Sequence, residues 1–258
     1  MGRGPVIARK RDITNLQRGK IFSLYAKIIT VATIKAGGDV NSPAVHDAVA
    51  KARKNNVPSE NIERALKKGT GADKEGNQIE EIFYEGYGAG GTGFIVKILT
   101  DNKNRTASNI RHLFSKNGGN LAETGSLSSF SFKFAGVCYV VLNGKTLDEI
   151  EETIIESGAE DYVEEEEGKI KIITDLKDLA KVVNFLKSSG IFVEDYAPEY
   201  VPVNFIEITD FDKALKILKL IDDLEDDEDV EFVWTNYDIA EDLALKVREA
   251  IENNKFRS

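Results

Sequence analysis

Cysteine, histidine and long apolar runs are scarce in this sequence. With a single cysteine, Cys138, the chain cannot form an internal disulfide, which is compatible with a reducing compartment. The two histidines, His46 and His112, have no further histidine or cysteine at ligand spacing, so no metal site and no cofactor is expected. No apolar run approaches the roughly 18 residues of a membrane span, and the N-terminal region lacks the apolar core of a secretory signal. We therefore expect a cytosolic globular protein that does not contact membranes.

Catalytic constellations are also missing. No spacing in the chain nominates a nucleophile with its base, a pair of carboxylates or a metal, so we expect neither an enzyme nor a small-molecule substrate. Scattered carboxylates are abundant, and counting alone does not exclude a hydrolase. The acidic run "DDLEDDEDVEF", residues 222–232, has no glycine at the sixth position of a calcium loop. We expect it to be a solvated connection between a helix and a strand, with Trp234 beyond it in the core.

Charge is unevenly distributed along the chain. The net charge is −10, yet residues 1–72 hold 14 Lys and Arg against 5 Asp and Glu. The remaining 186 residues hold 20 Lys and Arg against 39 Asp and Glu. Such asymmetry indicates a segment that binds polyanions, attached to an acidic body.

Residues 1–77 are predicted to form a basic helical domain. In "IFSLYAKIITVATIKAGG" the apolar residues Ile21, Leu24, Tyr25, Ile28 and Ala32 share one helical face. A second helix should begin at the Ser42-Pro43 cap and bury small residues, and a third should follow a Ser59 cap. Three short helices make a small bundle.

The stretch "YEGYGAGGTGFIVKILTD", residues 84–101, contains the pattern G-x-G-x-x-G twice. In a dinucleotide cradle that pattern opens a helix, whose N-terminus holds the phosphates. Here Phe94 to Leu99 is β-branched and apolar, which is typical of a buried strand. The stretch is therefore predicted to be a hairpin with a glycine-rich turn.

Two α/β units follow. Residues 135–202 alternate as β-α-β-β-α-β, the ferredoxin-like order. The segments 78–134 and 203–258 lie on either side of this unit, and each lacks helices or strands that the other supplies. In the first segment, residues 126–134, "SLSSFSFKF", alternate as a strand. The predicted fold is α+β: a three-helix domain, then two α/β (ferredoxin-like) domains, one inserted in the other.

Four segments carry a family resemblance: "NVPSENIERALKKGTG", "YEGYGAGG", "LTDNKNRTASNIRHLFSKNGGNLAETGSL" and "LEDDEDVEFVWTNYD". They resemble signatures of the YebC/PmpR family, which includes the mitochondrial translational activator of cytochrome c oxidase. The resemblance spans about Arg18 to Asp238 and implies the same three-domain fold. It also implies a DNA-binding transcriptional regulator or, in some members, a ribosome-associated factor for proline-rich stretches.

The chain departs from the family at its start, where "GRGPVIARKRD" replaces a segment that carries a histidine and a tryptophan. If those residues contact nucleic acid in relatives, the contact is altered here, although Arg9, Lys10 and Arg11 keep positive charge.

The best candidate site is the set of basic residues of the helical domain. As a group they are predicted to reach solvent and bind phosphates; the simpler alternative is an ordinary solvated surface with cations at helix ends. The candidates are Arg9, Lys10, Arg11, Arg18, Lys20, Lys27, Lys51, Arg53, Lys54, Arg64, Lys67 and Lys68.

The segment "TDNKNRT", residues 100–106, allows two interpretations beyond a glycosylation acceptor, which the missing secretory signal argues against. Asn104 or Thr106 caps a helix, or the loop contacts RNA or protein. The contact loop would use Asn102, Asn104, Arg105, Arg111 and His112, and the glycine turn and "NGGNL" could gather beside it.

The sequence therefore predicts a nucleic-acid-binding regulator of gene expression. Its partner is DNA, or alternatively ribosomal RNA on the ribosome. A protein scaffold without nucleic acid would leave the basic segment unexplained.

Overall fold

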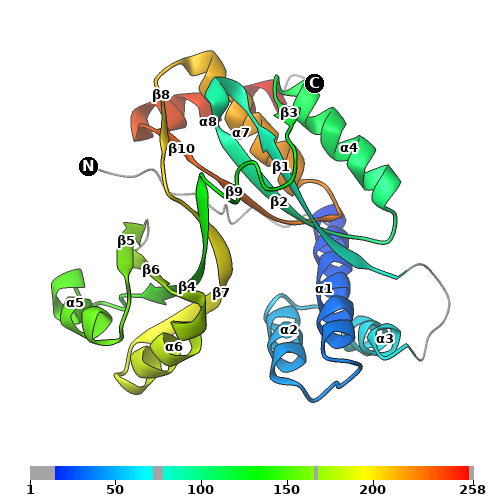
Figure 1. Ribbon diagram of the computed structural model, residues 1–258, viewed down its shortest axis with the longest axis vertical. Helices are drawn as coiled ribbons and strands as arrows, with labels where there is room; N and C mark the ends of the chain where they lie inside the picture. Colours follow the sequence, from blue (N-terminus) through cyan, green and yellow to red (C-terminus); the bar gives the residue numbers. More distant parts are fainter. Residues whose placement is uncertain (1–14, 72–77, 166–167, 256–258) are drawn as a thin grey trace. The chain divides into compact units, whose positions relative to one another are not determined.

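The protein is described here by a computed structural model, which places residues 15–71, 78–165 and 168–255 (Figure 1). It is an α+β fold, as predicted. Three hydrophobic clusters lie in the helical domain, in the segments around the insertion, and in the insertion itself. The insertion, Gly125–Phe205, is one compact unit, and the rest of the described chain forms the other.

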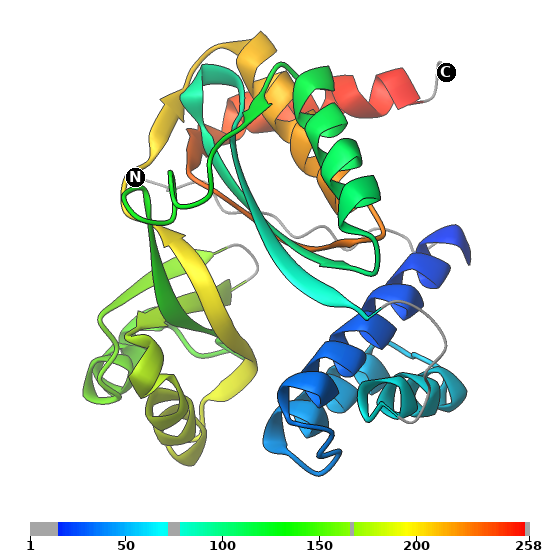
Figure 2. The same ribbon diagram turned by 45° about the vertical axis from the view of Figure 1, so that its right-hand side comes forward.

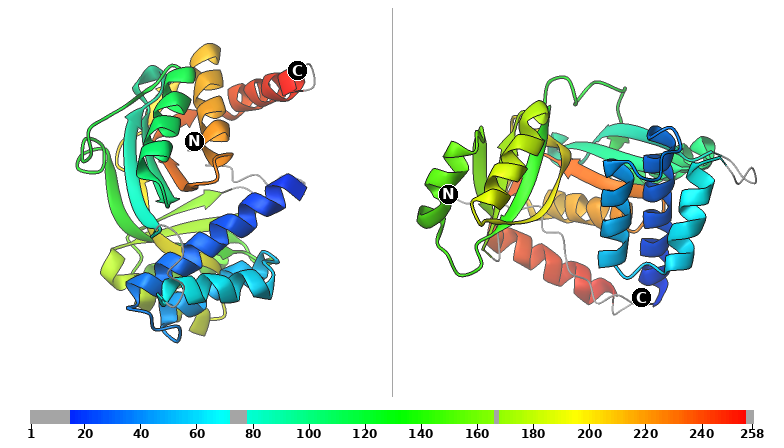
Figure 3. Two further views of the ribbon diagram at one scale, coloured as in Figure 1. Left: turned by 90° about the vertical axis from the view of Figure 1, so that its right-hand side faces the viewer. Right: turned by 90° about the horizontal axis from the view of Figure 1, so that it is seen from below.

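The helical domain consists of three helices, with α1 lying between the other two (Figure 3, right). Ser42 caps α2 by accepting a hydrogen bond from the Val45 amide, and Pro43 is the first helical residue, as predicted. The expected cap Ser59 is instead the first residue of α3, after Pro58. The helices are α1 (Asn15–Lys35), α2 (Pro43–Lys54) and α3 (Ser59–Gly69).

The buried face of α1 agrees with the predicted one in part. Ile29 is fully buried, and it packs with Phe22 and Tyr25 against the small residues of α2 and α3. Of the predicted stripe, Tyr25, Ile28 and Ala32 pack against this cluster, whereas Ile21 and Leu24 are half-buried and lie outside it. Because α1 has apolar residues around most of its surface, periodicity did not single out one face.

Helix α3 is held close to α1 by its last residue. A Cβ on Gly69 would lie 2.4 Å from Thr33 Cβ and 2.9 Å from the Thr30 carbonyl oxygen. Only glycine allows this approach, so the basic end of α3 is fixed against α1.

The split α/β domain contains a four-stranded antiparallel sheet of order β3-β1-β2-β9. Helices α4 and α7 pack on one face of it (Figure 2), with Ile110 and Phe114 of α4 and Ile217 of α7 in the core. Trp234 is buried in β9, as predicted. The elements are β1 (Glu80–Tyr87), β2 (Gly93–Thr100), α4 (Lys103–Lys116), β3 (Asn120–Leu121), α7 (Phe211–Glu225) and β9 (Val230–Thr235).

The glycine-rich stretch is the predicted hairpin. Strands β1 and β2 pair from Glu80↔Thr100 to Tyr87↔Gly93, and one short turn of 3-10 helix, Ala89–Gly91, joins them. Gly90 and Gly91 have φ of 73° and 80°, which glycine adopts without strain. Because a strand and not a helix follows the glycines, the turn has no helix N-terminus at which a pyrophosphate would be held.

The insertion has the predicted ferredoxin-like order, with strands arranged β5-β6-β4-β7. Helices α5 and α6 bury Ile150, Ile154 and Leu186 against Cys138 and Ile172 of the sheet. Its elements are β4 (Phe132–Val141), α5 (Leu147–Glu156), β5 (Asp161–Glu165), β6 (Lys169–Thr174), α6 (Leu179–Ser188) and β7 (Phe192–Pro202).

One expectation about the split domain was wrong. The strand expected over residues 126–134 begins only at Phe132, and it is the start of β4, paired with β7 within the insertion. The strand after the insertion, β8 (Ile206–Ile208), does not join the main sheet but pairs in parallel with β10 (Tyr237–Ile239). The final helix, α8 (Glu241–Lys255), adds Val247 and Ile251 to the core.

Candidate nucleic-acid interface

Five of the candidate cations lie in the last turns of α2 and α3, namely Lys51 and four residues with no ion-pair partner in the described chain. Arg53, Lys54 and Lys67 are exposed, Lys68 is half-exposed, and none of the four forms an ion pair with another described residue. The carbonyl end of a helix favours positive charge, which accounts for the position of these four residues. Their ammonium and guanidinium groups remain available to an anion.

The other candidates of the helical domain vary in their surroundings. Arg18 is exposed, and Lys51 is half-buried. Arg64 is 2.8 Å from Glu60 one turn earlier, with both side chains largely exposed. An exposed ion pair of this kind contributes little stability, so Arg64 can release the Glu60 carboxylate and contact a phosphate instead. Arg9, Lys10 and Arg11 lie outside the described residues.

Lys20 is exposed, as predicted, whereas Lys27 does not reach solvent as predicted, and both are in contact with the α/β domain. The Lys20 ammonium donates to the carbonyl oxygen of Asp226, and the Lys27 ammonium donates to that of Glu228 at 2.9 Å. Lys27 also forms an ion pair of 2.6 Å with Asp229, and its side chain is only 14% exposed. Lys20 and Lys27 thus both contact the connection between α7 and β9.

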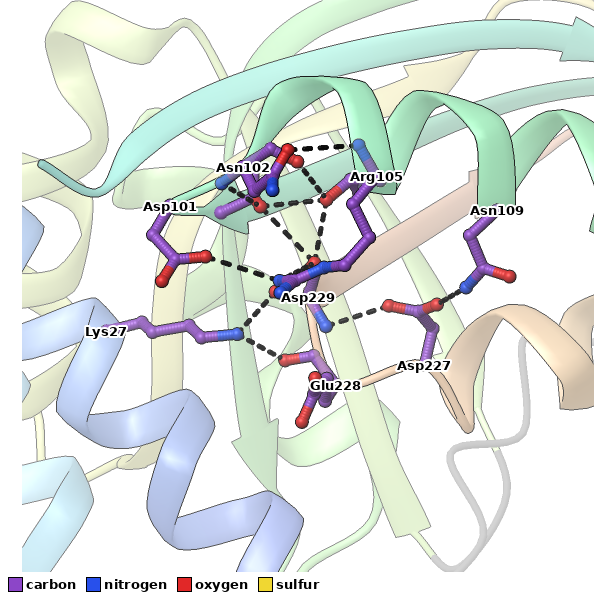
Figure 4. A network of polar contacts seen from close by, with 10 residues as sticks. Lys27, Asp101, Asn102, Arg105, Asn109, Asp227, Glu228 and Asp229 are labelled. Atoms are coloured by element: carbon purple, nitrogen blue, oxygen red, sulfur yellow. Dashed lines mark hydrogen bonds and ion pairs between the residues drawn. The ribbon is translucent and has the colours of Figure 1, made fainter. Parts of the chain in front are cut away.

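Asp229 is the centre of this polar network (Figure 4). Its side chain is 4% exposed, and besides Lys27 it accepts hydrogen bonds from Thr106 at 2.7 Å and Arg105 at 3.1 Å. Thr100 lies at 3.3 Å from the same carboxylate. The expectation that the acidic run is a solvated connection is therefore wrong at Asp229, which joins α1, the end of β2 and the start of α4.

The network keeps Asp229 ionised. Burial alone would raise the pKa of Asp229, but hydrogen bonds from Lys27, Thr106 and Arg105 and the charge of Lys27 outweigh it and lower the pKa below its ordinary value. A buried carboxylate needs such partners, because an unpaired charge in this position would be strongly unfavourable.

A second set of ion pairs lies nearby. Glu81 of β1 contacts Lys35 of α1 at 2.7 Å and Lys97 of β2 at 3.3 Å, and Lys97 contacts Glu231 at 2.9 Å. Burial would lower the pKa of Lys97, but the charges of Glu231 and Glu81 outweigh it and raise the pKa. Lysines 20, 27 and 35 of α1 thus all contact groups of the α/β domain.

The structure assigns a different cap in the "TDNKNRT" segment. Asn102 caps α4 by accepting a hydrogen bond from the Arg105 amide at 3.1 Å, so the predicted caps Asn104 and Thr106 are wrong. The side chain of Arg105 is half-exposed and contacts Asp101 and Asp229. Asn104, Arg111 and His112 are exposed on α4.

The glycine turn, the "TDNKNRT" segment and the "NGGNL" segment do not all gather at one end of the domain. The glycine turn follows Tyr87, whereas "TDNKNRT" begins at Thr100, at the opposite end of the same hairpin. The "NGGN" turn after α4 does lie at the glycine end: a Cβ on Gly119 would be 2.5 Å from the Tyr87 carbonyl oxygen. Arg105 is therefore separated from the glycine turn by the length of β2.

Other chemistry finds little support in the described part of the chain. There, no three His, Cys, Asp or Glu residues come together as a metal-ligand group. Cys138 is fully buried, and burial raises the pKa of its thiol to about 12. No helix among the placed residues is long and apolar enough to cross a bilayer.

The helical domain and the α/β domains both match known protein families. Residues 5–72 match the TACO1/YebC protein N-terminal domain, and residues 79–237 match the TACO1/YebC second and third domain. The chain belongs to the TACO1/YebC family.

Similar proteins cover nearly the whole chain. A "Probable transcriptional regulatory protein" of Halothermothrix orenii is 42% identical, over 94% of this chain and 96% of the relative. One of the same name from Persephonella marina is 41% identical, over 93% and 96%. The crystal structure of a conserved hypothetical protein from Aquifex aeolicus has a TM-score of 0.82 and 39% identity, covering 91% of this chain and 96% of that one.

For this TACO1/YebC protein, the residue of the polar network that sequence reasoning missed is Asp229. It sits in a run of acidic residues, where composition predicts solvent exposure. The only signal was its position directly before the apolar start of β9, which places it at the edge of the core. Its partners Lys27 and Arg105 are 202 and 124 residues away in the chain.

Proposed function

We propose that this protein is a nucleic-acid-binding regulator of gene expression without catalytic activity, which holds phosphate groups by the basic ends of α2 and α3. The observation that carries the proposal is the set of cations there that lack ion-pair partners in the described chain, Arg53, Lys54, Lys67 and Lys68. The curated relatives' names, which describe transcriptional regulators, make double-stranded DNA the first candidate partner.

Ribosomal RNA is the second candidate, and the charge of α3 favours it. Recognition helices of DNA-binding proteins place their N-terminal residues against base edges in the major groove. The exposed residues near the start of α3 include Glu60 and Glu63, which phosphates flanking a groove would repel. If only the basic helix ends make contacts, the protein recognises the shape of the phosphate backbone and not the base sequence, as proteins do when they bind folded RNA.

The salt dependence of affinity tests phosphate binding. If about four cations each neutralise one phosphate, the logarithm of the affinity for a DNA duplex should fall against the logarithm of salt concentration with a slope of about −3.6. Fluorescence anisotropy of the full chain with a labelled duplex measures this slope. A slope near zero would remove the proposal.

Crosslinking in cells then separates the two partners. Sequencing of the bound nucleic acid should give promoter DNA if the protein regulates transcription. Enrichment of ribosomal RNA at one locus supports a role in translation instead, and recovery of neither would support a scaffold without nucleic acid.

A further inference from the structure

One side of α1 is covered by oxygen atoms of the connection between α7 and β9. Lys20 and Lys27 lie seven residues apart, two turns of helix, and so project in nearly the same direction. They contact the carbonyl oxygens of Asp226 and Glu228 and the carboxylate of Asp229. An ammonium group makes the same kind of contact with phosphate oxygens.

The helical domain and the α/β domain have separate hydrophobic cores. The cluster around Ile29 contains residues of the helical domain alone, and the cluster around Phe94 contains none of them. Each core can persist when the polar contacts between the two domains open. The contacts that Lys20, Lys27 and Lys35 make with the α/β domain are polar, and polar contacts between domains of one chain permit relative motion.

We infer that residues Asp226–Asp229 form an acidic latch, which occupies the phosphate-binding groups of α1 and is displaced by nucleic acid. This inference rests on the proposed function. In the closed state described here, Lys20 and Lys27 are held by oxygen atoms of the latch, while the basic ends of α2 and α3 are available. In the open state, Lys20 and Lys27 bind phosphate as well, so nucleic acid binds the open state more tightly and shifts the population toward it.

The latch lowers the affinity of the closed protein. When only a fraction of the molecules can use the full set of cations, the apparent dissociation constant rises by the inverse of that fraction. A protein that is open about one tenth of the time would bind about tenfold more weakly than one that is always open. The latch would thus reduce weak, non-specific binding of nucleic acid by the regulator.

Asp229→Asn tests the latch because the substitution keeps the shape of the side chain and removes its charge. With a DNA duplex and a single-stranded RNA of equal length as probes, we expect Asp229→Asn to bind about five- to tenfold more tightly than the wild type. The salt slope should become steeper by about one to two, since one or two further phosphates are neutralised.

Two matched variants separate the latch from a general change in charge. Asp227→Asn changes the net charge equally and in the same connection, but Asp227 contacts Asn109 and the Asp229 amide. We expect little change from it. Adding Lys27→Gln to Asp229→Asn should remove about one unit of the gained slope. An equal gain in affinity for Asp227→Asn and Asp229→Asn would overturn the latch. So would a folded Asp229→Asn variant that binds no more tightly than the wild type.

Hydrogen exchange on the wild-type chain gives a test that needs no variant. When the duplex is added, backbone amides of residues 226–231 and of the Arg105–Thr106 segment should exchange faster, while those at the ends of α2 and α3 slow down. Slower or unchanged exchange at 226–231 would overturn the latch. Slowing at α2 and α3 would still support the proposed function, and its absence there would count against that function separately.

Discussion

Lysines on α1 and basic residues at the ends of α2 and α3 have the same chemistry but different neighbours. Lys27 is 14% exposed and paired with Asp229, whereas Lys54 and Lys67 are exposed and form no ion pair within the described chain. The comparison shows that positive charge in a segment does not identify its binding residues. Whether a cation can bind an external phosphate depends on whether a carboxylate of the protein already pairs with it.

Removing the unpaired cations should have the largest effect on binding. Replacing all four with glutamine should weaken affinity for a DNA duplex about 100-fold and make the salt slope shallower by about three to four. A control variant that replaces two exposed lysines of the insertion should change the affinity and the salt slope only slightly. Anisotropy titrations measure both, and equal losses would show that net charge alone decides binding. The four residues are Arg53, Lys54, Lys67 and Lys68, and the controls are Lys145 and Lys181.

Replacing the paired lysine should change stability. Lys27→Met leaves Asp229 buried with one cation fewer, and Arg105 and Thr106 compensate only in part. We expect a loss of about 2 kcal/mol in the free energy of unfolding. Lys54→Met, at an exposed site, should stay within about 0.5 kcal/mol of the wild type. Urea unfolding compares the two, and similar midpoints would contradict the difference between the helices.

The contact that holds the basic end of α3 on α1 is also open to test. Gly69→Ala places a Cβ 2.4 Å from Thr33 Cβ, so α3 must shift, at a cost of about 1–2 kcal/mol. Gly19→Ala is the matched control, because its Cβ meets nothing within 4 Å. There alanine should stabilise the helix by about 0.5–1 kcal/mol. Thermal unfolding should move in opposite directions for the two variants, and a shared direction would count against close packing at Gly69.

A smaller effect is expected from pH. Because the folded-state pKa of Asp229 is lowered, its contribution to stability is full above the unfolded-state value of about 3.9 and is lost as pH falls through the folded value. The wild type should therefore lose about 1 kcal/mol more than Asp229→Asn between neutral pH and pH ~3. Unfolding curves at several pH values measure this, and parallel losses would show that the carboxylate is not stabilised by folding.

The sequence determined the fold class and the order of most elements. Apolar periodicity placed the hairpin between Glu80 and Thr100, and the Ser42-Pro43 cap marked the start of α2. These features depend on neighbours within a few residues, so local physics is sufficient to find them. The family segments added the three-domain arrangement, with which the matches to the TACO1/YebC domains agree.

Only the tertiary structure decided which charged residues are available. A sequence shows Lys27 as one cation in a basic domain and Asp229 as one acid in an acidic run, and each alone predicts exposure. Folding brings them to 2.6 Å across 202 residues, where low solvent access makes pairing necessary. Electrostatic pairing of this kind depends on distance in space, which composition and periodicity do not contain.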